Sequence, residues 1–117
     1  MSKKTFYALQ RYKDGPDGEM KSGYLKKDGL DVQNDFGLNL GVYKTMETKP
    51  TDITPTKIWY VVDADCGLSI ASGDTKAKAV QVALERLKGT DMEVYKEKVR
   101  KAIDTYGLPP NRRITYL

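Results

Sequence analysis

The segment Lys57-Ile58-Trp59-Tyr60-Val61-Val62-Asp63 decides the fold, because β-branched and aromatic residues fill it almost without interruption. Such a run predicts a central strand that is covered on both faces or nearly so. The next residues, Asp63-Ala64-Asp65-Cys66-Gly67, are typical of a turn. The alternating segment 68–72 then predicts a strand that returns as the second arm of a hairpin.

Two helices are expected after this hairpin. Ser72-Gly73-Asp74 leads into a helical pattern, which predicts a helix over 75–88 with Asp74 as its N-cap and Gly89 just after its end. Thr90-Asp91-Met92-Glu93 matches a capping box, so a second helix is expected to start there and to end at Gly107. The residues expected to face the sheet are Ala77, Val80, Ala83, Leu84 and Leu87 in the first helix and Met92, Tyr95, Val99, Ala102, Ile103 and Tyr106 in the second.

The first half of the chain predicts shorter strands. Residues 5–12 are rich in aromatic side chains and stop at a Gly/Pro/Asp cluster, and a strand over 20–26 is expected to pair back on them and to close at the turn pair Asp28-Gly29. Residues 28–41 predict a loop with a turn of helix at most. The remaining expectations are a strand over 40–46 and a proline-containing connector over 48–55. Residues 111–117 are too few to assign, and an edge strand is one option for them.

The order of these elements sets the fold class. Strands first and helices last predict an α+β fold, an antiparallel sheet of four or five strands that is packed on one face by two C-terminal helices. The length of 117 residues predicts a single domain over 1–117.

The composition excludes several kinds of chemistry. The chain has no histidine and one cysteine, which removes imidazole-based catalysis and the usual His/Cys zinc sites. One cysteine fits a reducing compartment. No apolar run reaches signal-peptide or membrane-spanning length. We therefore expect a cytoplasmic protein with no cofactor and no resident metal.

The net charge of +4 is spread thinly along the chain, and only the last helix and the tail predict a local basic patch. The candidate partner-binding residues are Lys96, Arg100, Lys101, Arg112, Arg113 and Tyr116. The first three fall on the side of the helix away from its apolar stripe. Acidic residues interleave with them at i,i+3 and i,i+4 spacing, so a solvated, ion-paired helix face is the alternative interpretation.

The eight tyrosines suggest an interface, because each ring offers contact area and a hydroxyl at its rim. Those expected at the surface are Tyr12, Tyr24, Tyr43 and Tyr116. The alternative is that they fill half-buried sheet positions.

Asp63 and Asp65 are the only close carboxylate pair in a predicted ordered element. If the strand continues through both, they share a face and suit a hard cation or an acid–base pair. Turn chemistry explains the same residues. Cys66 follows them, but the chain has no imidazole to activate it. No glycine-rich phosphate-binding motif is present.

The segment that runs from Trp59-Tyr60-Val61-Val62 through Ser72-Gly73-Asp74-Thr75-Lys76-Ala77-Lys78-Ala79-Val80 to Leu87 resembles the strand-turn-strand-helix core of HicB-type antitoxins. In that family Gly-Asp-Thr opens the helix and alanines follow. This resemblance implies an antitoxin-like regulatory protein. In its overall make-up the chain also resembles small phage-encoded accessory proteins, among them anti-CRISPR inhibitors of host defence nucleases.

We therefore expect a non-enzymatic small binding protein that acts by occupying a surface of a macromolecular partner, as a phage or mobile-element inhibitor or regulator of a nucleic-acid-processing complex of the anti-CRISPR type. The alternatives are a direct nucleic-acid-binding or antitoxin-like regulatory protein, and a small metal-dependent hydrolase that uses Asp63 and Asp65. The expected partner is a protein or ribonucleoprotein rather than free nucleic acid or a membrane. A homodimer is left open.

Overall fold

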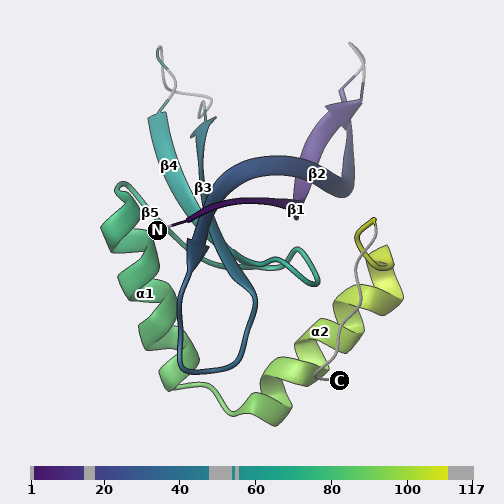
Figure 1. Ribbon diagram of the computed structural model, residues 1–117. Helices are drawn as coiled ribbons and strands as arrows, with labels where there is room; N and C mark the ends of the chain where they lie inside the picture. Colours follow the sequence, from purple (N-terminus) through teal and green to yellow (C-terminus); the bar gives the residue numbers. More distant parts are fainter. Residues whose placement is uncertain (1, 15–17, 48–53, 55, 111–117) are drawn as a thin grey trace.

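The computed structural model describes residues 2–14, 18–47, 54 and 56–110, with the backbone alone at 11–14, 19–20 and 47. The elements are β1 (Lys3–Asp14), β2 (Glu19–Val32), β3 (Leu40–Glu47), β4 (Thr56–Asp63), β5 (Ser69–Gly73), α1 (Lys76–Lys88) and α2 (Met92–Tyr106). The five strands form one antiparallel sheet in the order β1-β2-β3-β4-β5 (Figure 1). The helices follow the sheet in the chain, so the α+β fold predicted from the sequence is confirmed.

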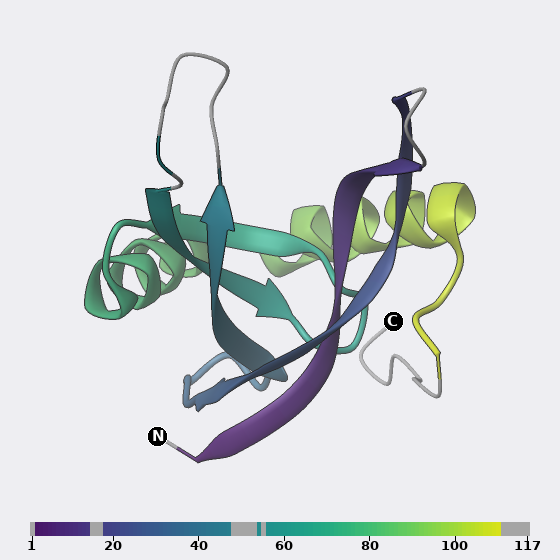
Figure 2. The ribbon, with the colours of Figure 1, turned by 90° about the horizontal axis from the view of Figure 1, so that it is seen from above.

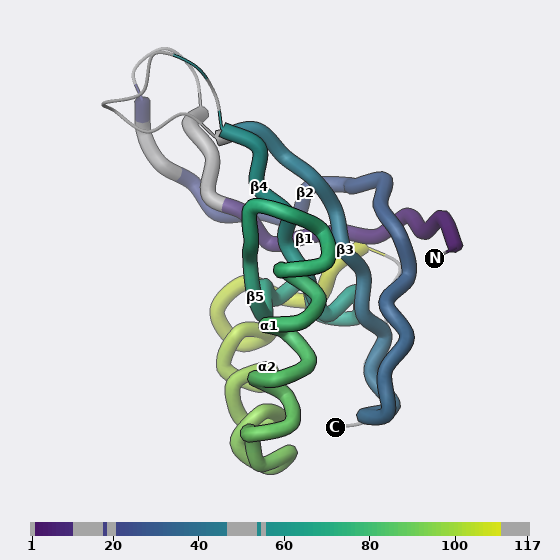
Figure 3. Tube along the Cα trace, turned by 90° about the vertical axis from the view of Figure 1, so that its left-hand side faces the viewer, coloured from purple at the N-terminus to yellow at the C-terminus, as the bar shows by residue number. Residues whose placement is uncertain are grey.

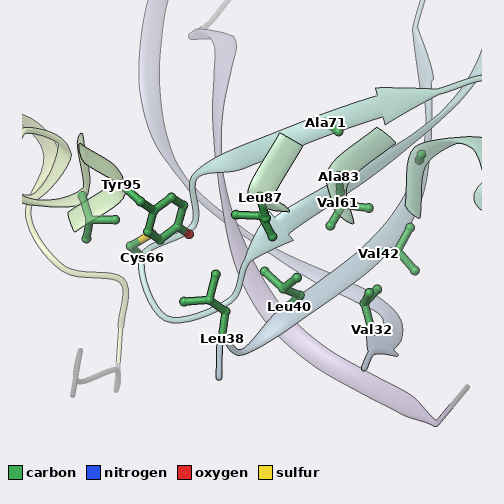
Figure 4. Packing of buried hydrophobic residues seen from close by; sticks show 12 residues of the cluster. Val32, Leu38, Leu40, Val42, Val61, Cys66, Ala71, Ala83, Leu87 and Tyr95 are labelled. Carbon is green, nitrogen blue, oxygen red and sulfur yellow. The ribbon is translucent and has the colours of Figure 1, made fainter. Parts of the chain in front are cut away.

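Helix α1 covers one face of the sheet, where it packs against β5, β4 and β3. Two residues of α2, Tyr95 and Val99, are buried in the same hydrophobic cluster, where Tyr95 lies beside Leu87 of α1 and Cys66 of the β4–β5 turn (Figure 4). Both helices therefore bury apolar side chains on the same face. Transfer of a large apolar side chain into such a core contributes about 1.5–3 kcal/mol.

The β1–β2 hairpin covers part of the opposite face. Phe6 and Ala8 of β1 are buried there against Tyr43, Val62 and Ala64. The Leu9 amide donates to the Gly67 carbonyl at 2.8 Å, so the hairpin crosses the sheet and reaches the β4–β5 turn. Val61 and Val62 of β4 are consequently buried on opposite faces, as the apolar run predicts. The predicted central position is wrong, because β3 is the middle strand and β4 lies beside the edge strand β5.

Strand β2 is much longer than the sequence predicts. Asp28 and Gly29 do not form a turn but lie within β2, and the loop is confined to residues 33–39. Asn34 fixes this loop, because its Nδ2 donates to the carbonyl of Leu38 at 2.8 Å and its Oδ1 accepts from the amide of Phe36 at 3.0 Å. The loop lies beside the C-terminal half of α1 (Figure 3).

The N-cap of each helix lies one residue later than predicted. Thr75, not Asp74, is the N-cap of α1, and its hydroxyl accepts from the Lys78 amide at 3.1 Å. Asp91, not Thr90, caps α2 by accepting from the Glu93 amide at 2.8 Å. Each predicted cap stands beside another residue that caps helices well. The helical register, which packing sets, decides between them.

The buried stripes of the helices also differ slightly from those predicted. Ala77 is exposed and Ala79 is buried in its place, where Ala79 lies against the backbone of Gly73. Tyr106 at the end of α2 is 46% exposed rather than buried. The predicted connector 48–55, apart from residue 54, and the tail 111–117 lie outside the described residues.

Candidate functional site

The basic patch predicted on α2 is largely ion-paired. Lys96 Nζ lies 3.5 Å from a Glu93 carboxylate oxygen, and the Arg100 guanidinium donates to Glu97 at 3.2 Å. Lys101 is exposed. This arrangement is what the alternative interpretation, a solvated helix face, predicts. Three further predicted residues, Arg112, Arg113 and Tyr116, lie outside the described part of the chain.

The Asp63 and Asp65 pair serves the fold. Asp63 is fully buried; its Oδ2 accepts from the Tyr95 hydroxyl at 2.5 Å and its Oδ1 from the Asp65 amide at 2.9 Å. The two side chains do not share a strand face, because β4 ends at Asp63 and the chain turns. Among the described residues, no group of three or more His, Cys, Asp or Glu side chains is placed to hold a metal ion. This geometry does not support the hydrolase alternative.

A lysine joins the same region to the start of β1. The Lys4 ammonium donates to Asp31 Oδ1 at 2.7 Å, to the Leu40 carbonyl at 3.2 Å and to Asn39 Oδ1. Asn39 Nδ2 in turn donates to Asp65 Oδ1 at 2.9 Å. These bonds tie β1, the 33–39 loop and the β4–β5 turn together, so the charge of Lys4 is already matched inside the protein.

The sheet divides where β2 leaves β3. The two strands pair only at Leu30–Val32 with Leu40–Val42, whereas β3 pairs with β4 along its whole length. Beyond this point the β1–β2 and β3–β4 hairpins splay apart (Figure 2). We call the place where they part the fork and define it as residues 28–30 of β2 and 43–47 of β3.

Two glycines and one aromatic ring produce the fork. Phe6 is fully buried and lies over the backbone at Gly29 and Gly41. A Cβ at Gly29 would clash with the Val42 carbonyl oxygen of β3 and would also come within 2.9 Å of the Phe6 ring, and a Cβ at Gly41 would come closer still to the ring. Only glycine fits at both places, and β2 passes onto the second face of the sheet and leaves the β3 edge close to them.

Two hollows border the fork on opposite faces of β3. The cationic hollow, about 540 Å³, lies on the face that α1 covers and is lined mainly by Lys3, Thr5, Asp28, Leu30, Lys44 and Trp59. The neutral hollow, about 410 Å³, lies on the opposite face and is lined mainly by Leu9, Gln10, Tyr43, Thr45, Met46 and Tyr60. The register explains this division, because directly paired residues share a face: Lys44 with Trp59 on one side and Tyr43 with Tyr60 on the other.

The neutral hollow ends on a row of aromatic rings. Tyr43 is only 3% exposed, and its ring centroid lies 6.0 Å from that of Phe6 and 5.7 Å from that of Tyr60. Lys27 Nζ lies 5.1 Å from the Tyr43 ring centroid, and Gln10 donates to the Tyr43 hydroxyl at 2.6 Å. The predicted exposure of Tyr43 is therefore wrong, because the β1–β2 hairpin covers it.

The cationic hollow carries excess positive charge. Lys3 and Lys44 are exposed, and Lys44 Nζ lies 5.8 Å from the Trp59 ring centroid. Asp28 is the carboxylate among the residues that line this hollow, and it accepts from the Thr5 hydroxyl at 3.1 Å. An anionic group in this hollow would lie near the ammonium groups of Lys3 and Lys44, beside the ring of Trp59. None of these residues belongs to the sequence-predicted site, since no local motif marks them.

Another predicted surface tyrosine, Tyr24, connects β2 to α2. Its hydroxyl donates to the Gly107 carbonyl, and burial, with smaller effects of Cys66 and Tyr106, raises its pKa above the ordinary value of 10.0. Tyr24 is partly buried rather than exposed. The side chains of the other two, Tyr12 and Tyr116, lie outside the described part of the chain.

A third hollow, about 670 Å³, lies between the 33–39 loop and α1. Asp35, Phe36, Leu84, Glu85 and Lys88 contribute to its lining. Its walls are side chains of mixed charge, and it borders no part of the fork.

Within the described residues, neither helix combines the length and apolar character that a membrane span requires. No protein-family model, curated protein or solved structure matches the chain.

Proposed function

We propose that this chain is a non-enzymatic binding protein that acts by occupying a surface of a macromolecular partner, and that it contacts the partner through the fork. One observation carries this proposal: the β3 edge at the fork lies between two preformed hollows of different chemistry. Hollows that combine apolar side chains with a few placed polar groups are typical of binding sites. The patch on α2 has weaker support, because its two ion pairs already engage Lys96 and Arg100.

Protein or ribonucleoprotein is the partner class that we favour. The finer hypothesis, an inhibitor or regulator of a nucleic-acid-processing complex of a phage or mobile element, rests on the resemblance in overall make-up alone. The antitoxin-like alternative rests on the resemblance of residues 59–87 to the HicB-type core. The order β4, turn, β5, α1 agrees with it, but hairpins followed by helices are common supersecondary units.

Direct nucleic-acid binding is the second candidate, since two lysines lie over aromatic rings at or beside the fork. It requires an affinity that falls steeply with salt, because each phosphate contact releases counterions. Measuring the affinity for a single-stranded oligonucleotide at rising salt tests this candidate.

A matched pair of charge reversals tests the leading proposal. Lys44→Glu changes the fork and Lys101→Glu changes the exposed face of α2 by the same charge. Tagged wild-type chain and both variants are used to capture partners from a lysate of the source cells, with quantification by mass spectrometry. We expect a stoichiometric partner that wild type and Lys101→Glu retain and Lys44→Glu loses. Loss with Lys101→Glu alone would move the contact to α2, and capture of no partner by the folded wild type would contradict the proposal.

A further inference from the structure

The β3 edge at the fork can accept another strand. Beyond Val42, β3 keeps β4 on one side, and no other strand in the described part of the chain pairs with it on the other. Alternate residues of an antiparallel strand direct their N–H and C=O groups to opposite neighbours. Along residues 44–47, backbone groups at every second residue therefore point towards the fork. Such an edge is a template for an added strand.

The hollows lie where the side chains of an added strand would go. Successive side chains of a strand point to opposite faces of the sheet. A strand beside residues 44–47 would therefore direct alternate side chains towards the cationic hollow and towards the neutral hollow, because these lie on opposite faces of β3.

The chemistry of the hollows defines the side chains that fit. The cationic hollow offers Lys3 and Lys44, so it suits a carboxylate. The neutral hollow offers uncharged side chains, apolar surfaces such as those of Leu9 and Tyr60 beside neutral polar groups, so it suits an uncharged side chain such as that of a small aliphatic residue. An acidic residue next to an aliphatic residue in an extended segment satisfies both.

We infer that the fork binds an extended segment of a partner protein in which acidic and aliphatic residues alternate, and that this segment adds to the edge of β3 that faces the fork. This inference rests on the proposed function and names the chemistry of its partner. The position of Lys44 on this edge also supports the inference. Lysine on an edge strand discourages pairing with neutral or basic strands, and it attracts an acidic one.

The structure favours a polypeptide over a nucleic acid as the occupant. Single-stranded nucleic acids bind by stacking bases on open aromatic faces. The Tyr43 ring is buried between Phe6, Tyr60 and Lys27, and Lys44 lies over Trp59. A backbone edge that alternates donors and acceptors matches another backbone, whereas phosphates supply acceptors only.

Short terminally blocked peptides test the inference directly. The first alternates glutamate and valine, and its matched control alternates lysine and valine. Two further versions of the first peptide are N-methylated, one at every glutamate and the other at every valine. In a strand these two sets of amides point to opposite sides, so only one version should lose binding. Affinity is measured by fluorescence anisotropy for wild type, Lys44→Glu and Lys101→Glu, with thermal unfolding as the check on folding.

We expect the glutamate–valine peptide to bind wild type and Lys101→Glu, and to bind folded Lys44→Glu about tenfold more weakly. Protection of the amides of residues 44–47 from hydrogen exchange on binding would place the peptide on the β3 edge. Equal binding of both N-methylated versions, or absence of peptide binding, would overturn strand addition. Binding of oligothymidylate that is sensitive to Lys44→Glu, without peptide binding, would overturn it in favour of nucleic acid.

The two proposals fail separately. A captured partner that depends on Lys44 but needs no extended segment leaves the proposed function in place and removes strand addition. Capture of no partner, together with no peptide binding, removes both.

Discussion

Substitution of Gly41 tests the origin of the fork most directly. An alanine Cβ at this position would lie 2.8 Å from both Cδ1 and Cζ of Phe6, whereas carbon atoms in contact normally lie about 3.5–4.0 Å apart. Phe6 is fully buried, so its ring cannot move towards solvent to make room for the new methyl group. We expect Gly41→Ala to lower the free energy of unfolding by about 1–3 kcal/mol, the usual cost of overpacking.

A double-mutant cycle identifies the cause of this loss. Phe6→Leu removes the ring edge that the new methyl group meets. The double variant should therefore be more stable than the sum of the single effects predicts, by at least about 1 kcal/mol. Gly89→Ala is the control, because its Cβ would lie 3.7 Å from the Glu85 carbonyl oxygen and its φ of −89° suits any residue; it should be neutral or stabilise by up to about 1 kcal/mol.

Urea unfolding, followed by circular dichroism, measures all four chains under one condition. A neutral Gly41→Ala would contradict the close approach of Phe6. Additivity of the two substitutions within about 0.5 kcal/mol would show that the ring does not cause the loss.

Three further predictions concern contacts outside the fork. Tyr95→Phe leaves the buried Asp63 Oδ2 without its hydroxyl donor, so we expect a loss of about 1–3 kcal/mol in urea unfolding; an unchanged midpoint would contradict the bond. Asp91→Ala should cost about 0.5–2 kcal/mol and more than Thr90→Ala, because Asp91 caps α2; the reverse order would restore the predicted capping box. Because the pKa of Tyr24 is raised in the folded protein, neutral Tyr24 contributes stability that is fully present below the unfolded-state pKa of 10.0. This contribution is lost as the pH rises through the pKa of the folded state. Stability should therefore fall in alkaline titration, less steeply in Tyr24→Phe, and identical slopes would refute this.

The second half of the fold could be predicted because its signals are local. The continuous apolar run of β4 requires burial on both faces, and the stripes of α1 and α2 require a sheet to cover. The caps were misplaced by one residue, because Asp74-Thr75 and Thr90-Asp91 each hold two residues that cap well. The side-chain types in the sequence narrow the N-cap to two neighbouring residues, and the packing of the helix on the rest of the fold decides which of the two is used.

The first half could not be predicted in the same way, since its glycines serve distant contacts. Asp28-Gly29 has the composition of a hairpin turn. Gly29 is instead required by the Val42 carbonyl of β3 and by the Phe6 ring, which comes from a strand more than twenty residues earlier in the chain. The same contact explains why Tyr43 is buried, since the hairpin that Phe6 anchors covers the second face. No local pattern distinguishes a glycine that turns the chain from one that admits a ring.

The candidate site was missed for a related reason. Charge along α2 was visible in the sequence, and its i,i+3 spacing also predicted, as the alternative, the pairing of Lys96 and Arg100 with acidic neighbours that the structure shows. The fork depends on where the β2–β3 register stops, and Lys3, Lys44 and Trp59 meet only as a result. The sequence contains no local signal for the residue at which the pairing of β2 with β3 stops.

Lys4 shows why the choice of lysine matters when the fork is tested. It borders the cationic hollow, but its ammonium is held by Asp31, Asn39 and the Leu40 carbonyl. Removing it would leave a partly buried carboxylate without its cation, and the resulting loss of stability would resemble a loss of binding. Lys3 and Lys44 are exposed, so reversing their charge changes the potential of the hollow at little cost to the fold. Selective loss of binding on reversal of either lysine is therefore informative, whereas loss on substitution of Lys4 is not.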